Sequence, residues 1–193
     1  MTRFVCGLGI ALGILLGAHP GSAQESLSCP YRGSDPAARR SPLDSAMFQV
    51  DGHDVKVCYG RPSARGRTMI GGNAVPFGEI WRTGADETTK IRSAIALSIA
   101  GIDVEVGTYA LYTVPGEREW QIIVNRAWQQ WGRENYYTDE VRAQEVGRAT
   151  VPVERVEDHI ETFTIRTEPA NDGVYLIMEW EHTRVRIPIA AGS

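Results

Sequence analysis

Short runs of alternating apolar and polar residues, separated by turn residues, make up most of the chain after residue 45. This alternation is typical of strands that bury one face. In Ala94–Ala100 it places Ile95, Leu97 and Ile99 on the same face. The predicted strands are Met47–Val50, Asp54–Tyr59, Glu79–Thr83, Thr88–Ile91, Ala94–Ala100, Thr108–Val114, Trp120–Asn125, Thr150–Val156, Ile160–Thr167, Val174–Glu181 and Thr183–Ile189.

Turn residues predict how these strands connect. Asp51-Gly52 is a strong hairpin signal, and Gly84-Ala85-Asp86 and Pro115-Gly116-Glu117 predict two more hairpins. Helical spacing occurs in one segment, Thr138–Val146, with Thr138 as a candidate N-cap. Strands that do not alternate with long helices argue against a parallel doubly wound sheet. We therefore expect an all-β fold: a single antiparallel β-sandwich domain over residues 46–190, with one short helix.

The N-terminus has the pattern of a secretory signal. A basic start at Arg3 precedes the apolar stretch Phe4–Ala18, then His19-Pro20-Gly21 and small residues ending at Ala23. An apolar stretch of about 15 residues is short for a bilayer span, although a retained anchor is the alternative. We predict a signal peptide over residues 1–23, cleaved after Ala23, and an extended arm or linker over residues 24–45.

Composition and charge narrow the function classes. The chain has 193 residues, is 42% hydrophobic and 23% charged, and carries a net charge of −4. These values are those of a globular protein rather than a disordered one. An acidic chain offers no basic footprint for nucleic acid. We expect an exported protein, periplasmic or secreted, with no nucleic-acid partner and no transmembrane anchor once the signal is cleaved.

Cleavage would leave two cysteines, Cys29 and Cys58. An even number in an exported chain predicts a disulfide between them, and two unpaired thiols are the alternative. Nothing resembles paired Cys-x-x-Cys spacing, and His53, His159 and His182 are scattered along the sequence. We therefore predict no metal site and no cofactor.

Two polar segments could carry chemistry. Tyr59–Arg67 holds Arg61 and two further arginines in a loop rich in Gly, Pro and Ser, which is compatible with an anion site or with pairing to the protein's own acids. Gly78–Glu87 carries Trp81 and Arg82, which point to opposite faces if the segment is a strand.

The acidic residues of that second segment could have a structural or a catalytic role. Arg82 could pair with Glu87 or Glu79 and make the turn rigid. Alternatively, two close carboxylates among Glu79, Asp86 and Glu87 could act as general acid and base.

Aromatic residues gather between Trp120 and Tyr137. We expect Trp120 to lie in the core, whereas Trp128 and Trp131 fall in a predicted loop, interleaved with Gln, Arg, Glu and Asn. Aromatic rings mixed with such polar groups suit stacking and hydrogen bonding to sugars or polar rings.

An ordered set of motifs resembles the domain-of-unknown-function 2911 family. The matching segments are Tyr59–Arg67, Val75–Gly78, Trp81–Glu87, Gly107–Gly116, Trp120–Asn125, Gln130–Gly132, Glu179–Glu181 and Arg184-Val185. The resemblance spans about Met47 to Ile189 and implies an exported bacterial protein, but no activity. Where it implies Ala-Asn-Glu, this chain has Ala85-Asp86-Glu87, so a role that needs the amide donor is lost here.

Three functions remain open. The first is a non-catalytic binder of a small polar ligand, a glycan or an envelope partner. The second is a carboxylate-based hydrolase that uses Glu79, Asp86 or Glu87 with Arg82. The third is a structural or assembly protein of the cell envelope, with an apolar patch on the C-terminal hairpin at Tyr175, Ile177 and Trp180. We favour binding; the candidate ligand-binding residues are Arg61, Trp81, Arg82, Asp86, Glu87 and Trp131.

Overall fold

The structure is a computed structural model of the chain, and it describes residues 29, 38–131 and 134–193. The predicted signal peptide and most of the predicted arm lie outside the described residues. Arm residue Cys29 and the end of the arm from residue 38 onward are described, and they turn out to contact the folded domain.

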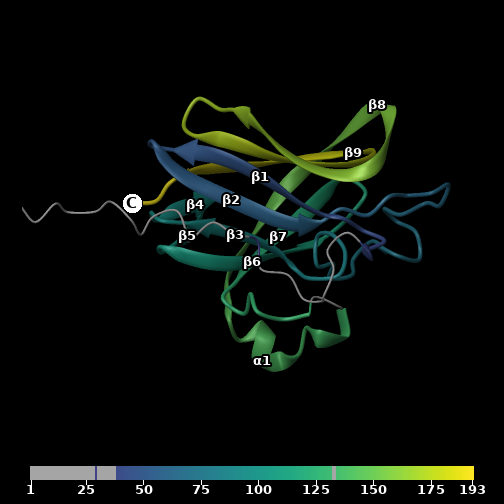
Figure 1. Cartoon of the computed structure of the whole chain (residues 1–193), viewed down its shortest axis with the longest axis horizontal. Helices are drawn as coiled ribbons and strands as arrows, with labels where there is room; N and C mark the ends of the chain where they lie inside the picture. Colours follow the sequence, from purple (N-terminus) through teal and green to yellow (C-terminus); the bar gives the residue numbers. More distant parts are fainter. Residues whose placement is uncertain (1–28, 30–37, 132–133) are drawn as a thin grey trace, which may run out of the picture.

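Nine strands form one antiparallel sheet in the order β1-β2-β3-β6-β7-β8-β9-β4-β5 (Figure 1). One α-helix occurs in the described part of the chain, α1 (Asp139–Arg142), after a 3-10 turn at Glu134–Tyr136. No helix among the described residues has the length and apolar character needed to cross a membrane. The strands are β1 (Leu43–Val50), β2 (His53–Gly60), β3 (Thr89–Ser93), β4 (Leu97–Ile99), β5 (Ile102–Val104), β6 (Gly107–Val114), β7 (Glu119–Asn125), β8 (Glu145–Pro169) and β9 (Val174–Ala191).

The long strand β8 turns the sheet into two layers. Its first part pairs with β7, ending at the Glu119–Pro152 pair. From Val153, which pairs with Val185, it pairs with β9 instead. A strand that changes sheets in this way forms a corner of a β-sandwich. The predicted sandwich is confirmed, with β8 and β9 lying across β1 and β2 in Figure 1.

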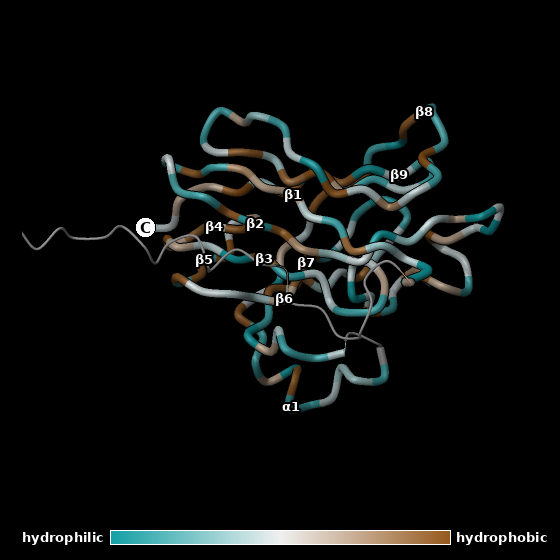
Figure 2. The backbone as a smooth tube through the Cα atoms, viewed as in Figure 1, coloured by the Kyte–Doolittle hydropathy of each residue, from teal (hydrophilic) through white to brown (hydrophobic). Residues whose placement is uncertain are grey.

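The core lies between the two layers. Val57 and Leu111 from one layer and Leu176 and Ile187 from the other are fully buried within a single cluster. In Figure 2 the hydrophobic residues recur along the strands, as the alternating pattern predicts. Four aromatic side chains meet in this core: Trp81, Trp120, Phe163 and Trp180.

Several predicted boundaries change. The predicted strand at Glu79–Thr83 is wrong: within it only Trp81 makes a bridge, pairing with Thr113 of β6. The positive φ angles of Thr83 (60°) and Gly84 (151°) end the extended conformation there, so no hairpin forms across Gly84-Ala85-Asp86. The helix is shorter than predicted. The two strands predicted before residue 170 are parts of the continuous strand β8, and the two predicted after it are parts of β9.

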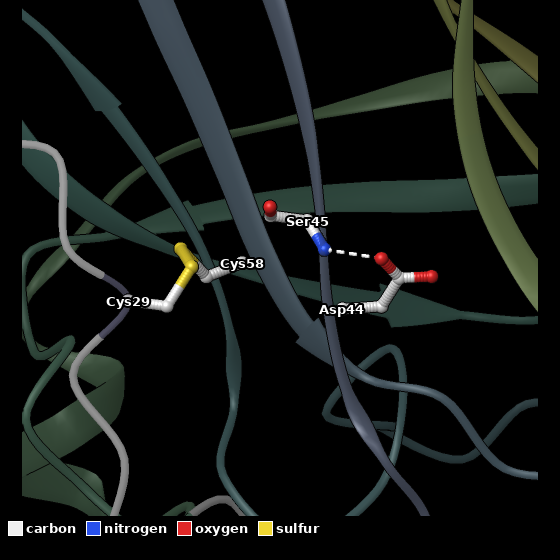
Figure 3. The surroundings of a disulfide bond; sticks show 4 residues. All are labelled: Cys29, Asp44, Ser45 and Cys58. Atoms are coloured by element: carbon white, nitrogen blue, oxygen red, sulfur yellow. Dashed lines mark hydrogen bonds between the residues drawn. A yellow bond between two sulfur atoms is a disulfide. The ribbon is translucent and has the colours of Figure 1, made fainter.

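The predicted disulfide is present. Cys29 is bonded to Cys58 of β2, with the two Cα atoms 5.6 Å apart, and the bond lies beside Asp44 and Ser45 of β1 (Figure 3). It links the arm to the domain across 29 residues of sequence, and such bonds are typical of exported proteins.

We expect Cys29→Ala to lower the free energy of unfolding by about 3 kcal/mol, because the bond restricts the unfolded chain. Chemical denaturation measures this change. Wild-type protein under reducing conditions is the matched control and should lose the same amount, whereas an unchanged unfolding curve in both samples would contradict the expectation.

Candidate functional site

A strained turn, Thr83–Glu87, packs against the end of β2. The amide of Ala85 donates a hydrogen bond to the carbonyl of Gly60, with an N–O distance of 3.2 Å. A Cβ atom on Gly60 would lie 2.0 Å from the Ala85 carbonyl oxygen, so only glycine allows this approach. Asp86 has a φ of 63°, and such backbone persists where the surrounding contacts enforce it. The turn is therefore held in one conformation.

An arginine from the arm binds both acids of this turn. The Nη2 atom of Arg39 lies 3.0 Å from Oδ2 of Asp86, and its Nη1 atom lies 3.3 Å from Oε1 of Glu87. A further short contact joins Nη2 to Oε2 of Glu87. The side chains of Arg39 and Glu87 are only 10% and 5% exposed. Burial lowers the pKa of Arg39, but the hydrogen bonds and charges of the two carboxylates outweigh it and raise that pKa.

Further polar side chains lie on the outer face of the layer that contains β1, β2, β3, β6 and β7. Lys90 of β3 pairs in register with Cys58 of β2 and is buried, with Nζ 5.7 Å from the centre of the Trp128 ring. Thr88 donates a hydrogen bond to the Tyr112 hydroxyl at 3.2 Å. Charged side chains are rarely so buried unless they have partners. We refer to Arg39, Asp86, Glu87, Thr88, Lys90 and Tyr112 as the outer-face cluster.

The segment that follows β7 covers this face, and α1 lies on the side of the sheet away from β9 (Figure 1). Tyr137 packs edge-on against Tyr112, with ring centres 4.7 Å apart, and donates a hydrogen bond to Oε1 of Glu145 at 2.5 Å. Burial raises the pKa of Tyr137, and its hydrogen bond to Glu145 adds to the effect. Glu145 also accepts two hydrogen bonds from Arg148, at 2.6 and 2.8 Å, and these lower its pKa.

A cavity of about 580 Å³ opens beside Tyr137, and we call it the Tyr137 cavity. Two guanidinium groups line it, those of Arg142 and Arg148, and Arg142 lies over the Tyr137 ring with its Cζ atom 5.6 Å from the ring centre. Among the described residues that line the cavity, Glu79 carries the only carboxylate. The lining residues are Gly78, Glu79, Ile80, Val114, Gln121, Tyr137, Arg142 and Arg148.

The candidate residues from the sequence do not form one site. Asp86 and Glu87 come together in the outer-face cluster. Trp81 is instead 3% exposed in the core, where its Nε1 donates to the Gly84 carbonyl at 3.0 Å, so it positions the turn. Arg61 lies near Asp44, with Nη1 3.5 Å from Oδ2, and donates to Thr164 at 3.1 Å.

The remaining candidates are half-buried. Arg82 precedes the turn, and its carbonyl accepts a hydrogen bond from the amide of Thr89 at 3.1 Å. Trp131 lies in the segment after β7. Glu87 is bound by Arg39 from the arm, a partner that the sequence did not indicate.

Sequence reasoning missed Arg39, Lys90, Arg142 and Arg148. Arg39 lies 48 residues from Glu87, and no local pattern links the two. Lys90 carried a usable signal: it is the one charged residue within the short β-prone run Thr88–Ile91. Arg142 sits in the last turn of a helix that was predicted, although the predicted helix pointed to no ligand.

The histidines and acids offer no metal centre in the part of the chain that the structure describes. His159 and His182, distant in sequence, lie with ring centres 5.4 Å apart. A group of three or more His, Cys, Asp or Glu side chains suited to a metal ion is not found among the described residues.

The C-terminal hairpin does not expose the apolar patch that an assembly role would need. Ile177 and Trp180 of β9 are buried, and Tyr175 is half-buried. The hairpin instead carries charged groups. Glu179 accepts hydrogen bonds from Arg166 and from Arg184; these outweigh the effect of burial and lower the pKa of Glu179.

Comparison with known proteins gives one family. A family model described as "Protein of unknown function (DUF2911)" matches residues 41–189, which cover nearly the whole described domain. No match was found among curated proteins or among solved structures.

Proposed function

Since the chain belongs to the DUF2911 family, to which no function is assigned, we propose a function from the chemistry of the Tyr137 cavity: non-catalytic binding of a small acidic ligand. The class that fits best is a sugar that bears a carboxylate, such as a uronic acid. The supporting observation is the charge of the lining. Two arginines and one glutamate make the lining residues net positive in a chain whose net charge is −4, and Glu145 pairs with one of the two arginines, Arg148.

The two guanidinium groups differ in their freedom to bind a ligand. Arg148 is held by Glu145 and by the Gln121 amide oxygen, at 3.3 Å. Arg142 forms no ion pair within the described part of the chain, so its donors remain available to an incoming carboxylate. An Arg–carboxylate pair is bidentate and strong, and the Gln121 amide offers hydrogen bonds to sugar hydroxyls.

Binding is favoured over hydrolysis because of where the carboxylates lie. Glycoside chemistry needs two carboxyl groups about 5–10 Å apart that open into one cleft. Asp86 and Glu87 share Arg39 and do not line the Tyr137 cavity, which has Glu79 as its only described carboxylate. Arg39 of the same chain already binds the two carboxylates that a hydrolase would use at this turn.

We propose that this binding takes place outside the cytoplasm, in the periplasm or in the medium. The disulfide and the predicted signal peptide support an exported protein. Acidic glycans of the cell envelope or of the surroundings would be ligands of the proposed class.

We expect uronic-acid oligosaccharides to bind measurably more tightly than their neutral counterparts, and Arg142→Gln to weaken that binding about tenfold or more. Isothermal titration calorimetry measures both effects. Arg155→Gln, an exposed arginine of β8 outside the cavity, is the matched control and should bind like the wild type.

Three results would count against this proposal. Equal affinity for acidic and neutral sugars would remove the role of the guanidinium groups. Binding that Arg142→Gln leaves intact but Trp131→Ala abolishes would move the site to the aromatic loop. Release of sugar products during the titration, lost in Glu79→Gln, would indicate a hydrolase.

A further inference from the structure

A second hollow lies where the arm meets the loop after β2. It has a volume of about 390 Å³, and we call it the Arg65 cavity. Three of its six lining residues are arginines: one from the arm, Arg40, and two from the loop, Arg65 and Arg67. No acidic residue lines it in the part of the chain that is described. Its lining residues are Arg40, Ser41, Pro62, Ser63, Arg65 and Arg67.

These three arginines are exposed, and they differ in their partners from the arginines of the chain that form ion pairs. Arg39, Arg61, Arg148, Arg166, Arg184 and Arg186 each form an ion pair with a carboxylate. Within the described residues, Arg40, Arg65 and Arg67 form none. No acid among the described residues therefore forms an ion pair with these three guanidinium groups, although acids outnumber bases in the chain.

Backbone carbonyls hold two of the three head groups in place. Arg67 donates from Nε to the Ala64 carbonyl at 2.9 Å and from Nη2 to the Ser63 carbonyl at 3.2 Å. Arg65 donates from Nη2 to the Arg40 carbonyl at 2.8 Å. A guanidinium has five N–H donors, so Arg67 keeps three and Arg65 keeps four. These arginines are positioned without being neutralised.

The frame beneath the hollow is firmly attached. The segment Pro62–Ala64 pairs with β8: the Phe163 amide donates to the Pro62 carbonyl and the Ala64 amide to the Glu161 carbonyl, both at 2.9 Å. Arg39, the residue directly before Arg40 in the sequence, binds Asp86 and Glu87 and so holds the arm beside this frame. Charges that are fixed before a ligand arrives reduce the ordering that binding requires.

We propose that the Arg65 cavity binds a phosphoryl group. A planar guanidinium presents parallel donors that fit phosphate oxygens, and a phosphate offers several strong acceptor oxygens to donors from different directions. Its charge of up to two matches three arginines better than the single charge of a carboxylate does. The site is separate from the Tyr137 cavity, and the two share no lining residue.

A nearby acid, Glu161, allows a specific test of this proposal. Oε1 of Glu161 accepts a hydrogen bond from the Arg65 amide at 2.7 Å. Glutamine keeps an acceptor oxygen in that place but removes the negative charge. Glu161→Gln should therefore tighten phosphate binding severalfold.

The test uses two sources of the same phosphoryl chemistry. Inorganic phosphate and pyrophosphate are titrated into the full exported chain by calorimetry. Flotation measures binding to phosphatidylcholine vesicles with and without phosphatidic acid. We expect binding in at least one of these two assays, and we expect the double variant Arg65→Gln/Arg67→Gln to weaken it about tenfold or more. Arg155→Gln should have no effect.

Each result then supports or overturns the proposal. Binding of free phosphate that the double variant loses identifies a soluble phosphorylated ligand, whereas binding only to phosphatidic acid identifies a lipid headgroup. Absence of binding in both assays, or binding that the double variant retains, would overturn the proposal. Arg40→Gln offers a second variant should the double variant misfold, because the Arg40 side chain is exposed and makes no hydrogen bond within the described residues.

Discussion

Trp81→Ala is expected to lower the free energy of unfolding by about 3–5 kcal/mol, the range found when a large aromatic side chain is removed from a packed core. The Trp81 ring stacks on Trp180, with ring centres 5.9 Å apart, and meets Trp120 and Phe163 edge-on at 6.0 and 5.0 Å. Its loss would leave a cavity between the two layers. It would also leave the Gly84 carbonyl without the indole donor. Equilibrium denaturation, followed by tryptophan fluorescence, measures the change.

Two other tryptophan variants separate packing from ligand contact. Trp81→Phe retains much of the ring and loses the donor, so its effect should be smaller than that of Trp81→Ala. Trp131→Ala removes a half-buried ring from the segment after β7 and should change stability far less. If Trp81→Ala left stability intact while reducing ligand binding, Trp81 would be a ligand-contacting residue and our assignment to the core would be wrong.

Glu87→Ala should lower the free energy of unfolding by about 3–5 kcal/mol, the usual effect of removing one partner of a buried ion pair. Arg39, whose side chain is 10% exposed, would lose two of its three close carboxylate contacts. Asp86 could compensate only in part, because its side chain is 37% exposed and its attraction is screened by water. Thermal and urea denaturation both report the loss.

A matched ion pair on the surface provides the control. Glu154 pairs with Arg186 at 2.7 Å, and these two side chains are 42% and 30% exposed. Glu154→Ala should therefore change the free energy of unfolding by less than about 1 kcal/mol. A double-mutant cycle of Arg39→Gln and Glu87→Gln then isolates the coupling between arm and turn. A coupling energy near zero would show that the arm does not hold the turn.

The arm joins features that sequence reasoning treated separately. The disulfide attaches it to β2, Arg39 attaches it to the Asp86–Glu87 turn, and Arg40 brings it to the Arg65 cavity. The described residues of segment 24–45, which was predicted as an extended arm or linker, therefore contribute side chains to the fold and to a proposed site. Through Arg39 the arm also contacts both candidate acids, Asp86 and Glu87.

Local signals were sufficient for most of the strands. Asp51-Gly52 and Pro115-Gly116-Glu117 do connect antiparallel strands, because their backbone preferences act over two or three residues. Alternation placed Leu97 and Ile99 in the core, since the two faces of a strand follow from a period of two. It failed at Glu79–Thr83, because the positive φ angles of Thr83 and Gly84 end the extended backbone there despite a β-prone composition.

By itself the sequence determined the all-β class and the family resemblance, and it predicted the disulfide pair that the structure contains. Each of these depends on composition, spacing or neighbouring residues. Only the tertiary structure decided that β8 joins both layers, that Trp81 faces the core and that Arg39 reaches Glu87. These relations join residues tens of positions apart, and their energy comes from burial and charge pairing, which exist only once the layers have packed. For the same reason, only the folded chain distinguishes the arginines that pair with acids from those that form no ion pair among the described residues.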